Sequence, residues 1–383
     1  MTRPAGKRTR ILHCHSTFSA GGKELRCARL INAFGPGVEH FIVSAEPDRM
    51  EAARHISSSI PVHYPDDFPS LVGKPTPGRL QRLARAMAGY DLVLTYNWGA
   101  MDAVMAHTLF SEAFGLPRLV HHEDGFNDDE RDRLKWGRNW YRRIALGRAS
   151  ALVVPSETLE RIALEVWQQP LGRVRHIPNG VDTASFDRFC QPDALRGLVK
   201  RPDELWVGTL AGLRAVKNLP RLVRAFAPLP PEWQLVIVGE GPEREAIRAE
   251  AARLGVEHRV HLPGFAADPA RFAGLFDIFA LSSDSEQAPI SLIEAMAAGK
   301  PAAATDVGDV AAMVAEANRP FIGADEQALA QALARLAADP ALRAQLGQAN
   351  RDKARAAFDE QVMIAAYRRL YSTALGGDGL PQP

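Results

Sequence analysis

Short runs of valine, isoleucine and leucine alternate along the chain with longer segments in which apolar residues recur at helical spacing. The apolar runs predict strands at 9–14, 40–44, 60–64, 91–95, 117–121, 150–154 and 173–177, and then at 205–210, 234–238, 258–262, 276–281 and 301–305. Amphipathic stretches such as 23–34, 78–89, 99–114 and 130–148 predict helices between them. This alternation predicts an α/β protein with parallel sheets covered by helices on both faces.

The alternation falls into two blocks, and 383 residues suffice for two domains of about 150 residues each. We expect two doubly wound, Rossmann-like domains, at 1–185 and 200–358, that face each other across a cleft. The polar segment 183–203 contains two prolines and is typical of an interdomain linker. A helix at 359–376 is expected to pack back on the first domain. Ligands of such sheets bind beyond the carboxyl ends of the strands, so the chemistry should lie in the loops there.

Charge and cysteine content restrict the function classes. The chain has 46 Lys and Arg against 45 Asp and Glu, so a nucleic-acid partner is not expected. Three widely spaced cysteines indicate a reducing compartment without disulfides. His13, Cys14 and His15 are neighbours in a predicted strand, where side chains alternate between faces, so they are not expected to converge on a metal. Without a secretory signal or an apolar run long enough for a membrane span, we expect a cytoplasmic protein, at most peripheral on the membrane.

The segment SSDSEQAPISLIEAMAAG, residues 282–299, is the most informative for chemistry. It follows a predicted strand and opens a helix that Pro289 starts. The backbone N–H groups of Ala288, Ile290 and Ser291 would lie at the helix N-terminus, where orphan donors and the helix dipole favour an anion such as a diphosphate. Glu286 and Glu294 flank this site and can accept hydrogen bonds from sugar hydroxyls. The alternative is a capped helix with two ordinary glutamates.

Together with the helix end EAMAAGKP, this segment resembles the E-x(7)-E signature of retaining glycosyltransferases of family 4, which have the GT-B architecture. The resemblance covers nearly the whole chain. It includes Gly21, Gly22 and Glu24 after the first strand, and VVPSE at 153–157 and IPNGVD at 177–182 late in the first domain. VGEGPER at 238–244, LPGF at 262–265 and ATDVGD at 304–309 follow in the order of the family's second domain.

The resemblance implies roles for the donor site. Glu286 would contact hydroxyls of the donor sugar, Glu294 would hold the ribose hydroxyls, and the main chain of Ala288, Pro289, Ile290 and Ser291 would hold sugar and phosphate. The region 262–265, with Gly264 and Phe265, would lie against the base, and Gly21 and Gly22 would form the family's glycine loop.

The loop GTLAGLRAVKN, residues 208–218, departs from the family. Lys217 matches the family lysine, but Gly212 stands where the family has an arginine. We expect Lys217 and Arg214 to neutralise the diphosphate; the alternatives are a second cation from the first domain and a solvated Lys217. The chain has no D-x-D triplet, so no metal and no further cofactor are expected.

The acceptor side is predicted after the strand at 117–121. Relatives often carry a histidine in patterns resembling x-E-H-G, whereas this chain has Glu123-Asp124-Gly125. Alternation makes one of His121 and His122 face the cleft. We expect His122 and Asp124, with Asn97, to line the acceptor site; the alternative for Asp124 is a cap or turn residue.

The stretch 131–148 has seven basic residues, one acidic residue, Trp136, Trp140 and Tyr141. Two interpretations stay open, core aromatics with a solvated basic face and a surface that meets anionic lipid or a polyprenyl-diphosphate acceptor. From the second we predict peripheral membrane association through this stretch.

The resemblance implies a retaining transferase that moves a sugar from a nucleoside-diphosphate donor to a hydroxyl of a glycan or lipid-linked glycan, in bacterial envelope or exopolysaccharide synthesis. The expected catalytic set is His122, Asp124, Arg214, Lys217 and Glu286. A GT-B epimerase or phosphorylase is the nearest alternative. A nicotinamide dehydrogenase is disfavoured because Arg244 replaces the third glycine of G-x-G-x-x-G, and a sugar-binding hinge protein because no export signal is present.

Overall fold

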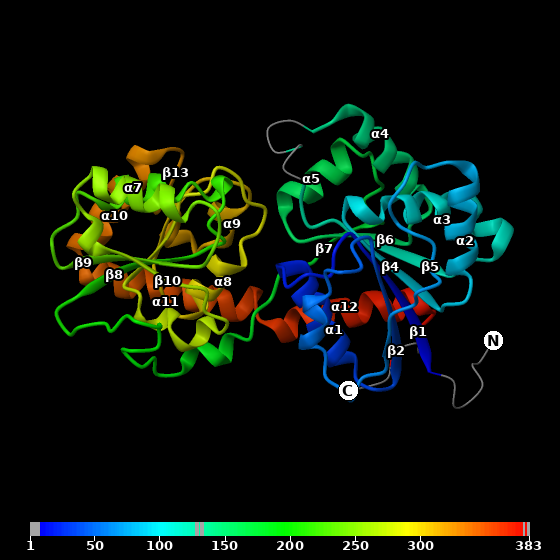
Figure 1. Ribbon diagram of the computed structural model, residues 1–383, viewed down its shortest axis with the longest axis horizontal. Coiled ribbons are helices and arrows are strands. Elements are labelled where there is room, and N and C mark those ends of the chain that lie inside the picture. The colour runs from blue at the N-terminus through cyan, green and yellow to red at the C-terminus, as the bar shows by residue number, and fades with distance from the viewer. Residues whose placement is uncertain (1–7, 127–129, 131–133, 378–379, 381–383) are drawn as a thin grey trace. The chain divides into compact units, whose positions relative to one another are not determined.

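The computed structural model describes residues 8–126, 130, 134–377 and 380, and it divides the chain into two units. The first unit comprises residues 1–177 and 363–383, and the second comprises residues 178–362. Each unit is built on one parallel sheet, which confirms the predicted α/β class (Figure 1). The predicted linker 183–203 falls within the second unit, where Cys190 and Leu195 are buried beside Trp206.

The sheet of the first unit has the order β3-β2-β1-β4-β5-β6-β7. Its strands are β1 (Thr9–His15), β2 (Val38–Ser44), β3 (Val62–His63), β4 (Leu92–Tyr96), β5 (Arg118–His122), β6 (Ala151–Val154) and β7 (Val174–His176). The central strands are buried over nearly their whole length, as expected where helices cover both faces.

Two hydrophobic clusters cover the two faces of this sheet. One face carries α2 (Pro77–Met87), α3 (Met101–Phe114), α4 (Trp136–Ala145) and α5 (Glu157–Glu165). The other face carries α1 (Gly22–Phe34) and the C-terminal helix α12 (Glu360–Leu375), drawn in red in Figure 1. Leu12 and Cys14 of β1 pack into the first cluster and Ile11 into the second, so alternation along β1 holds.

The sheet of the second unit has the order β10-β9-β8-β11-β12-β13. Its strands are β8 (Leu205–Leu210), β9 (Trp233–Val238), β10 (Val260–Gly264), β11 (Ile278–Leu281), β12 (Ala302–Thr305) and β13 (Ile322–Gly323). Its helices are α6 (Leu219–Phe226), α7 (Arg244–Arg253), α8 (Ile290–Ala297), α9 (Val310–Met313), α10 (Glu326–Ala338) and α11 (Pro340–Ala357). The two-residue strand β13 lies outside the predicted set.

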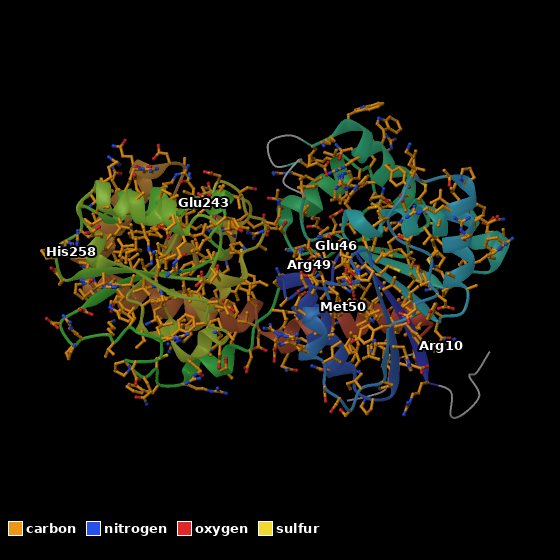
Figure 2. The ribbon with its side chains drawn as sticks, in the orientation of Figure 1. Arg10, Glu46, Arg49, Met50, Glu243 and His258 are labelled. Atoms are coloured by element: carbon orange, nitrogen blue, oxygen red, sulfur yellow. The ribbon has the colours of Figure 1, made fainter. Side chains whose placement is uncertain are left out.

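Helix ends follow local chemistry. Asp325 and Asp339 cap α10 and α11 by accepting the backbone N–H groups of Ala328 and Leu342. Gly115 ends α3 in the left-handed region at φ 57°. Charged side chains such as Glu46, Arg49 and His258 are exposed (Figure 2). Among the described residues, none of the helices is both long and apolar enough to cross a membrane.

Candidate functional site

The second sheet reverses its winding between β8 and β11, and the loops after these strands carry most of the predicted donor residues. In doubly wound sheets, ligands bind beyond the carboxyl ends of the strands at this kind of switch point. Lys217, after β8, and Glu286, after β11, meet there. The Nζ atom of Lys217 lies 2.5 Å from Oε1 of Glu286. The structure thus brings together two predicted residues that are far apart in sequence.

The backbone of Glu286 rests on the turn 307–309, within the motif ATDVGD. Gly308 has φ +56°, and a Cβ atom there would lie 2.2 Å from the carbonyl oxygen of Glu286. The N–H of Asp309 donates to the carbonyl of Gln287 at 3.0 Å. The hydroxyl of Ser283 donates to Oε1 of Glu286 at 2.7 Å. Only glycine fits at 308, so this motif positions the Glu286 loop.

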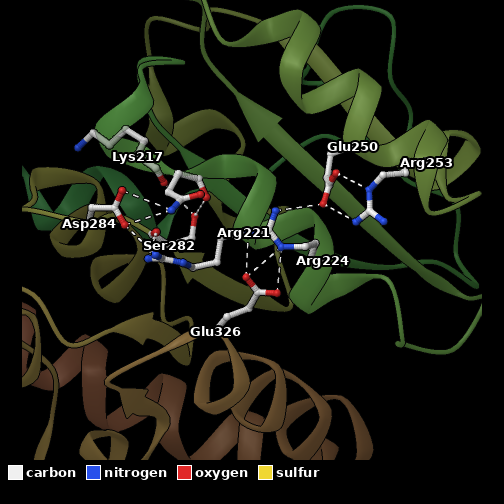
Figure 3. A network of polar contacts seen from close by, with 9 residues as sticks. Lys217, Arg221, Arg224, Glu250, Arg253, Ser282, Asp284 and Glu326 are labelled. Carbon is white, nitrogen blue, oxygen red and sulfur yellow. Dashed lines mark hydrogen bonds and ion pairs between the residues drawn. The ribbon is translucent and has the colours of Figure 1, made fainter.

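A second group of contacts joins the two loops below Lys217 (Figure 3). The carboxylate of Asp284 accepts hydrogen bonds from the side-chain amide of Asn218 at 3.1 and 3.3 Å and pairs with Arg221 at 2.8 Å. The hydroxyl of Ser282 donates to the carbonyl oxygens of Lys217 and Asn218 at 3.0 Å. Asn218 itself has φ 42°, a conformation that asparagine tolerates. Sequence reasoning missed Asp284, Asn218 and Arg221, although Asp284 stands inside the segment it singled out.

Helix α8 begins where the sequence predicted, with Pro289 as its N-cap. The first N–H groups of a helix have no acceptor inside it, so Ile290 and Ser291 present donors and the positive end of the dipole at this point. Glu294 lies half-buried in the second turn. A small pocket is lined by polar groups of Thr209, Lys217, Ser282, Ser283, Glu286 and Ser291. The arrangement is suited to an anion flanked by hydroxyl-bearing groups.

The glycines of VGEGPER have a structural explanation. Gly239 and Gly241 have φ of +150° and +156°, and Cβ atoms there would lie 1.9 Å from the carbonyl oxygen of Ala211 and 2.4 Å from that of Leu213. The N–H of Leu213 donates to the carbonyl of Glu240 at 2.9 Å. These glycines therefore let the turn after β9 pack on the loop after β8.

The remaining predicted donor residues are more exposed. Arg214 is exposed at the start of the short turn that holds Lys217, and Gly212 beside it is also exposed. Phe265 is 76% exposed, whereas Gly264 is buried with φ +94°. An aromatic ring left in solvent after β10 is available to stack on a planar ligand.

In the first unit, Gly21 is the N-cap of α1 and Gly22 begins it. A Cβ atom on Gly21 would lie 2.7 Å from Oε2 of Glu24. Glu24 is buried and paired with Lys23. The glycine loop thus leaves room for a buried carboxylate in the first turn of α1.

Asp124 and Asn97 lie together at the carboxyl ends of β5 and β4. The Oδ1 atom of Asn97 accepts the N–H of Asp124 at 2.8 Å. The carboxylate of Asp124 accepts two hydrogen bonds, at 2.6 and 2.9 Å, from the guanidinium of Arg26 in α1. Burial tends to raise the pKa of Asp124, but the charge and hydrogen bonds of Arg26 outweigh it and lower the pKa. Arg26 was missed because it is 98 residues away in the sequence.

His122 lies in an aromatic cluster instead of facing solvent. Alternation predicted that one of His121 and His122 faces a cleft, but both are buried, at 0% and 1% exposure. The ring of His122 stacks on Tyr96 at 4.5 Å, and its Nε2 lies 2.7 Å from the hydroxyl of Tyr371 in α12. Burial, and then the charge of Arg26, lowers the pKa of His122 to about 3. The prediction of a cleft-facing histidine overlooked α12, which covers this face.

Part of the basic segment 131–148 is internal; residues 131–133 lie outside the described residues. Arg142 is fully buried and pairs with Glu130 at 3.0 Å and with Glu123 at 3.3 Å. Arg138 pairs with Glu130 at 3.0 Å. These two arginines therefore do not contribute to a solvated basic face.

The outer face of α4 is apolar. Trp136, Trp140 and Ile144 follow one another at intervals of four residues and so share a face of the helix. Their exposed fractions are 76%, 44% and 51%. The guanidinium of Arg143 lies 5.0 Å from the centre of the Trp140 ring. Of the aromatics that the alternative placed in the core, Trp136 and Trp140 are exposed, whereas Tyr141 is half-buried against the first cluster.

Comparison with known families identifies both halves of the chain. Residues 20–185 match the family Glycosyltransferase Family 4, and residues 192–353 match Glycosyl transferases group 1.

Relatives and solved structures agree with these matches. The chain is 30% identical over 306 residues to the GDP-mannose-dependent alpha-(1-6)-phosphatidylinositol monomannoside mannosyltransferase of Mycolicibacterium smegmatis, covering 74% of this chain and 77% of that protein. This chain spans only 45–58% of the length of three further curated relatives. One is the lipopolysaccharide core biosynthesis glycosyltransferase LpsD of Rhizobium meliloti, 31% identical over 40% of this chain and 46% of LpsD. The crystal structure of Anabaena HepE in complex with UDP has a TM-score of 0.75 at 20% identity, over 95% of this chain and all of that chain.

Proposed function

Because this chain belongs to the GT-B glycosyltransferases with a family 4 first domain and a group 1 second domain, we propose that it is a retaining enzyme. It transfers a sugar from a nucleoside-diphosphate sugar to a hydroxyl of a glycan or lipid-linked glycan acceptor. The observation that carries this proposal is the pairing of Lys217 with Glu286, 2.5 Å apart, beside the N-terminus of α8.

The donor diphosphate is assigned to Lys217 and the first N–H groups of α8. A cation and oriented amides stabilise negative charge that grows as the diphosphate leaves. The same anion would draw Lys217 from Glu286 and release the carboxylate to accept hydrogen bonds from the donor sugar. Glu294, one turn into α8, is assigned to the ribose. The UDP in the HepE structure supports a nucleoside diphosphate as the ligand.

Arg214 and Lys217 take the place of a divalent metal at the diphosphate in this proposal. Arg214 is exposed and three residues from Lys217, so its long side chain can turn toward the phosphates. Turnover that persists without added Mg²⁺ or Mn²⁺ would support this assignment, and a strict requirement for either ion would contradict it.

Asp124 and Asn97 are assigned to the acceptor side. Their positions at the carboxyl ends of β5 and β4 are where doubly wound sheets bind ligands. The Arg26 pair keeps the Asp124 carboxylate ionised, so this carboxylate can accept a hydrogen bond from an acceptor hydroxyl. His122 is assigned a positioning role instead, since its ring is buried behind Tyr96 and Tyr371.

We assign the acceptor to the glycans and lipid-linked glycans from which bacterial envelope polysaccharides are built. The mannosyltransferase relative is named for a phosphatidylinositol-linked acceptor, and LpsD for lipopolysaccharide core biosynthesis. The exposed row of α4 supports contact with a lipid surface, because tryptophan favours the headgroup region. We therefore place the enzyme in the cytoplasm, peripherally on the anionic membrane that carries its acceptor.

A ligand screen followed by product analysis tests the proposal. Thermal unfolding is measured with UDP, GDP, ADP and their sugars, because a ligand that binds only the native state raises the melting temperature. The donor that shifts it most is then supplied, labelled in its sugar, with candidate glycans. A new glycoside with the donor's anomeric configuration supports the proposal. An epimerised sugar nucleotide or a sugar phosphate instead would identify an epimerase or a phosphorylase.

A further inference from the structure

A cluster of buried nitrogen and sulfur atoms lies inside the first unit, at the end of β1. His13 and His15 are two residues apart in this strand and share a face, and Cys27 of α1 lies against them. One ligand atom from each of the three lies within 4.8 Å of the others, and all three residues are buried. Alternation along β1, from which no convergence of His13, Cys14 and His15 was expected, places Cys14 on the other face. It leaves His13 and His15 on one face and carries no information about Cys27 of α1.

The spacing of His13 and Cys27 matches that of two neighbouring ligands around a tetrahedral metal. Nδ1 of His13 lies 3.5 Å from Sγ of Cys27. The hydroxyl of Tyr96 lies 3.2 Å from that nitrogen and 3.6 Å from that sulfur. Metal–nitrogen bonds of about 2.0–2.1 Å and metal–sulfur bonds of about 2.3 Å separate neighbouring ligand atoms by about 3.3–3.6 Å. His13 and Cys27 therefore already have the separation of two zinc ligands, and His15, whose ligand atom lies within 4.8 Å of theirs, would move closer to complete the site.

His15 provides an independent observation. Its side chain is fully buried, and both ring nitrogens lack a hydrogen-bond partner among the described residues. Strand register places it beside Tyr96, on which its ring stacks at 3.9 Å. A buried polar group without a partner destabilises the folded state, because it has lost its hydrogen bonds to water. A metal ion would provide that partner.

His40 completes the arrangement from β2. Its Nδ1 lies 2.9 Å from Nε2 of His13. A proton on Nε2 of His13, donated to His40, leaves the lone pair of Nδ1 directed at Cys27 and Tyr96. Histidines that bind metals commonly donate their other ring N–H to a neighbour in this way, which fixes the tautomer.

We propose that His13, His15 and Cys27 bind one zinc ion, with the hydroxyl of Tyr96 beside the fourth position, and that the ion fastens the end of β1 to α1. Two imidazoles and a thiolate without a carboxylate favour zinc over magnesium, calcium or manganese. Because every ligand is buried inside the first unit, the ion has a structural role. It acts on the base of the glycine loop, since residues 16–21 join these two elements.

Metal content and cobalt spectroscopy of the full chain test the proposal. The chain is produced in medium supplemented with Zn²⁺ or with Co²⁺, because buried ligands are best loaded during folding. We expect one equivalent of metal per chain, and in the cobalt form an intense thiolate-to-cobalt charge-transfer band in the near ultraviolet. Cys27→Ser should lose the band, whereas Cys14→Ser, which alters a buried thiol on the opposite face of β1, should keep it.

The variant His40→Leu tests the site while leaving all three proposed ligands in place. Loss of a partner to a metal-binding histidine lowers affinity by about 10- to 100-fold, measured by competition with a zinc chelator. A folded wild-type chain that holds no metal from either medium would overturn the proposal, whatever the variants do. A cobalt band unchanged in Cys27→Ser, or unchanged zinc affinity in His15→Ala, would overturn it too and leave a neutral hydrogen-bonded cluster.

Discussion

The Nζ atom of Lys217 lies 2.5 Å from Oε1 of Glu286, and this contact joins the loops that follow two adjacent strands, β8 and β11. A lysine paired in this way is already positioned where the donor phosphate is proposed to bind. The pair therefore links two assignments, since an anion that recruits Lys217 also frees Glu286.

Lys217→Ala should lower kcat by about 10²–10³ while changing KM much less, because charge on the diphosphate grows toward the transition state. Steady-state kinetics with the donor found in the screen measure both constants. Arg214→Ala should likewise lower kcat much more than it changes KM if Arg214 replaces the arginine absent at Gly212. Arg248→Ala, on the exposed face of α7, is the matched control. A Lys217 variant with unchanged kcat would remove this residue from the chemical step.

Glu294→Ala should weaken nucleotide binding by about 10- to 150-fold without unfolding the chain. A carboxylate that accepts hydrogen bonds from two hydroxyls contributes roughly 1.5–3 kcal/mol. Calorimetric titration with the nucleoside diphosphate gives the affinity, and circular dichroism verifies the fold. Glu245→Ala, an exposed glutamate of α7, should bind like wild type. Equal affinity in both variants would rule out the ribose assignment.

Asp124→Leu should destabilise the first unit by about 3–5 kcal/mol, because it removes the carboxylate that pairs with the buried guanidinium of Arg26. Urea denaturation monitored by fluorescence measures the free energy of unfolding. The double variant Arg26→Met with Asp124→Leu should recover most of the loss, since no buried charge remains. Additive effects of the two substitutions would mean that the ion pair is not coupled as the structure indicates.

Acid should destabilise the first unit through its buried histidines. Burial is the main cause that lowers the pKa of His122 and of His40 to about 3, against 6.5 in the unfolded chain. The neutral form is favoured in the folded state, so the stability is fully present above pH 6.5 and is lost as the pH falls toward 3. Through each histidine, the free energy of unfolding should fall by on the order of 3 kcal/mol between pH 7 and pH 4.

The measurement is the slope of unfolding free energy against pH. His122→Gln should reduce the slope between pH 6 and 4 by about 1.4 kcal/mol per pH unit. His258→Gln, at an exposed position in the second unit (Figure 2), should leave it unchanged. Identical slopes in wild type and the His122 variant would contradict a buried neutral ring.

Trp136→Ser combined with Trp140→Ser should abolish co-sedimentation with anionic vesicles. Binding should require anionic lipid and decrease with salt. Arg143→Ser should weaken binding about fivefold, the effect of roughly 1 kcal/mol. Arg142 is unsuitable for this test because it is buried in an ion-pair cluster. Leu171→Ser, at another exposed apolar position, is the control. Equal pelleting with neutral vesicles, or none at low salt, would contradict membrane docking.

Local pattern was enough to predict the elements and one part of the site. The apolar runs located twelve of the thirteen strands in the described part of the chain, because a strand buried on both faces must be nearly all apolar. The start of α8 at Pro289 and the positions of Glu286 and Glu294 around it also followed from the sequence, since a helix N-terminus is specified by neighbouring residues. The strand β13, at Ile322–Gly323, was missed because no run of valine, isoleucine and leucine marks it, whereas the equally short β3 lies within the predicted strand 60–64.

What the sequence by itself determined was therefore the α/β class, the loops at the strand ends and the positions of those predicted donor residues that are near one another in the chain. The tertiary structure decided every pairing between distant residues. Alternation assigned a face to His122 but could not show that α12, which follows more than 200 residues later, covers that face. Arg26 meets Asp124, and Cys27 meets His13, because α1 packs on the strand ends. Such contacts depend on how helices pack against the sheet, and one-dimensional spacing carries no information about that packing.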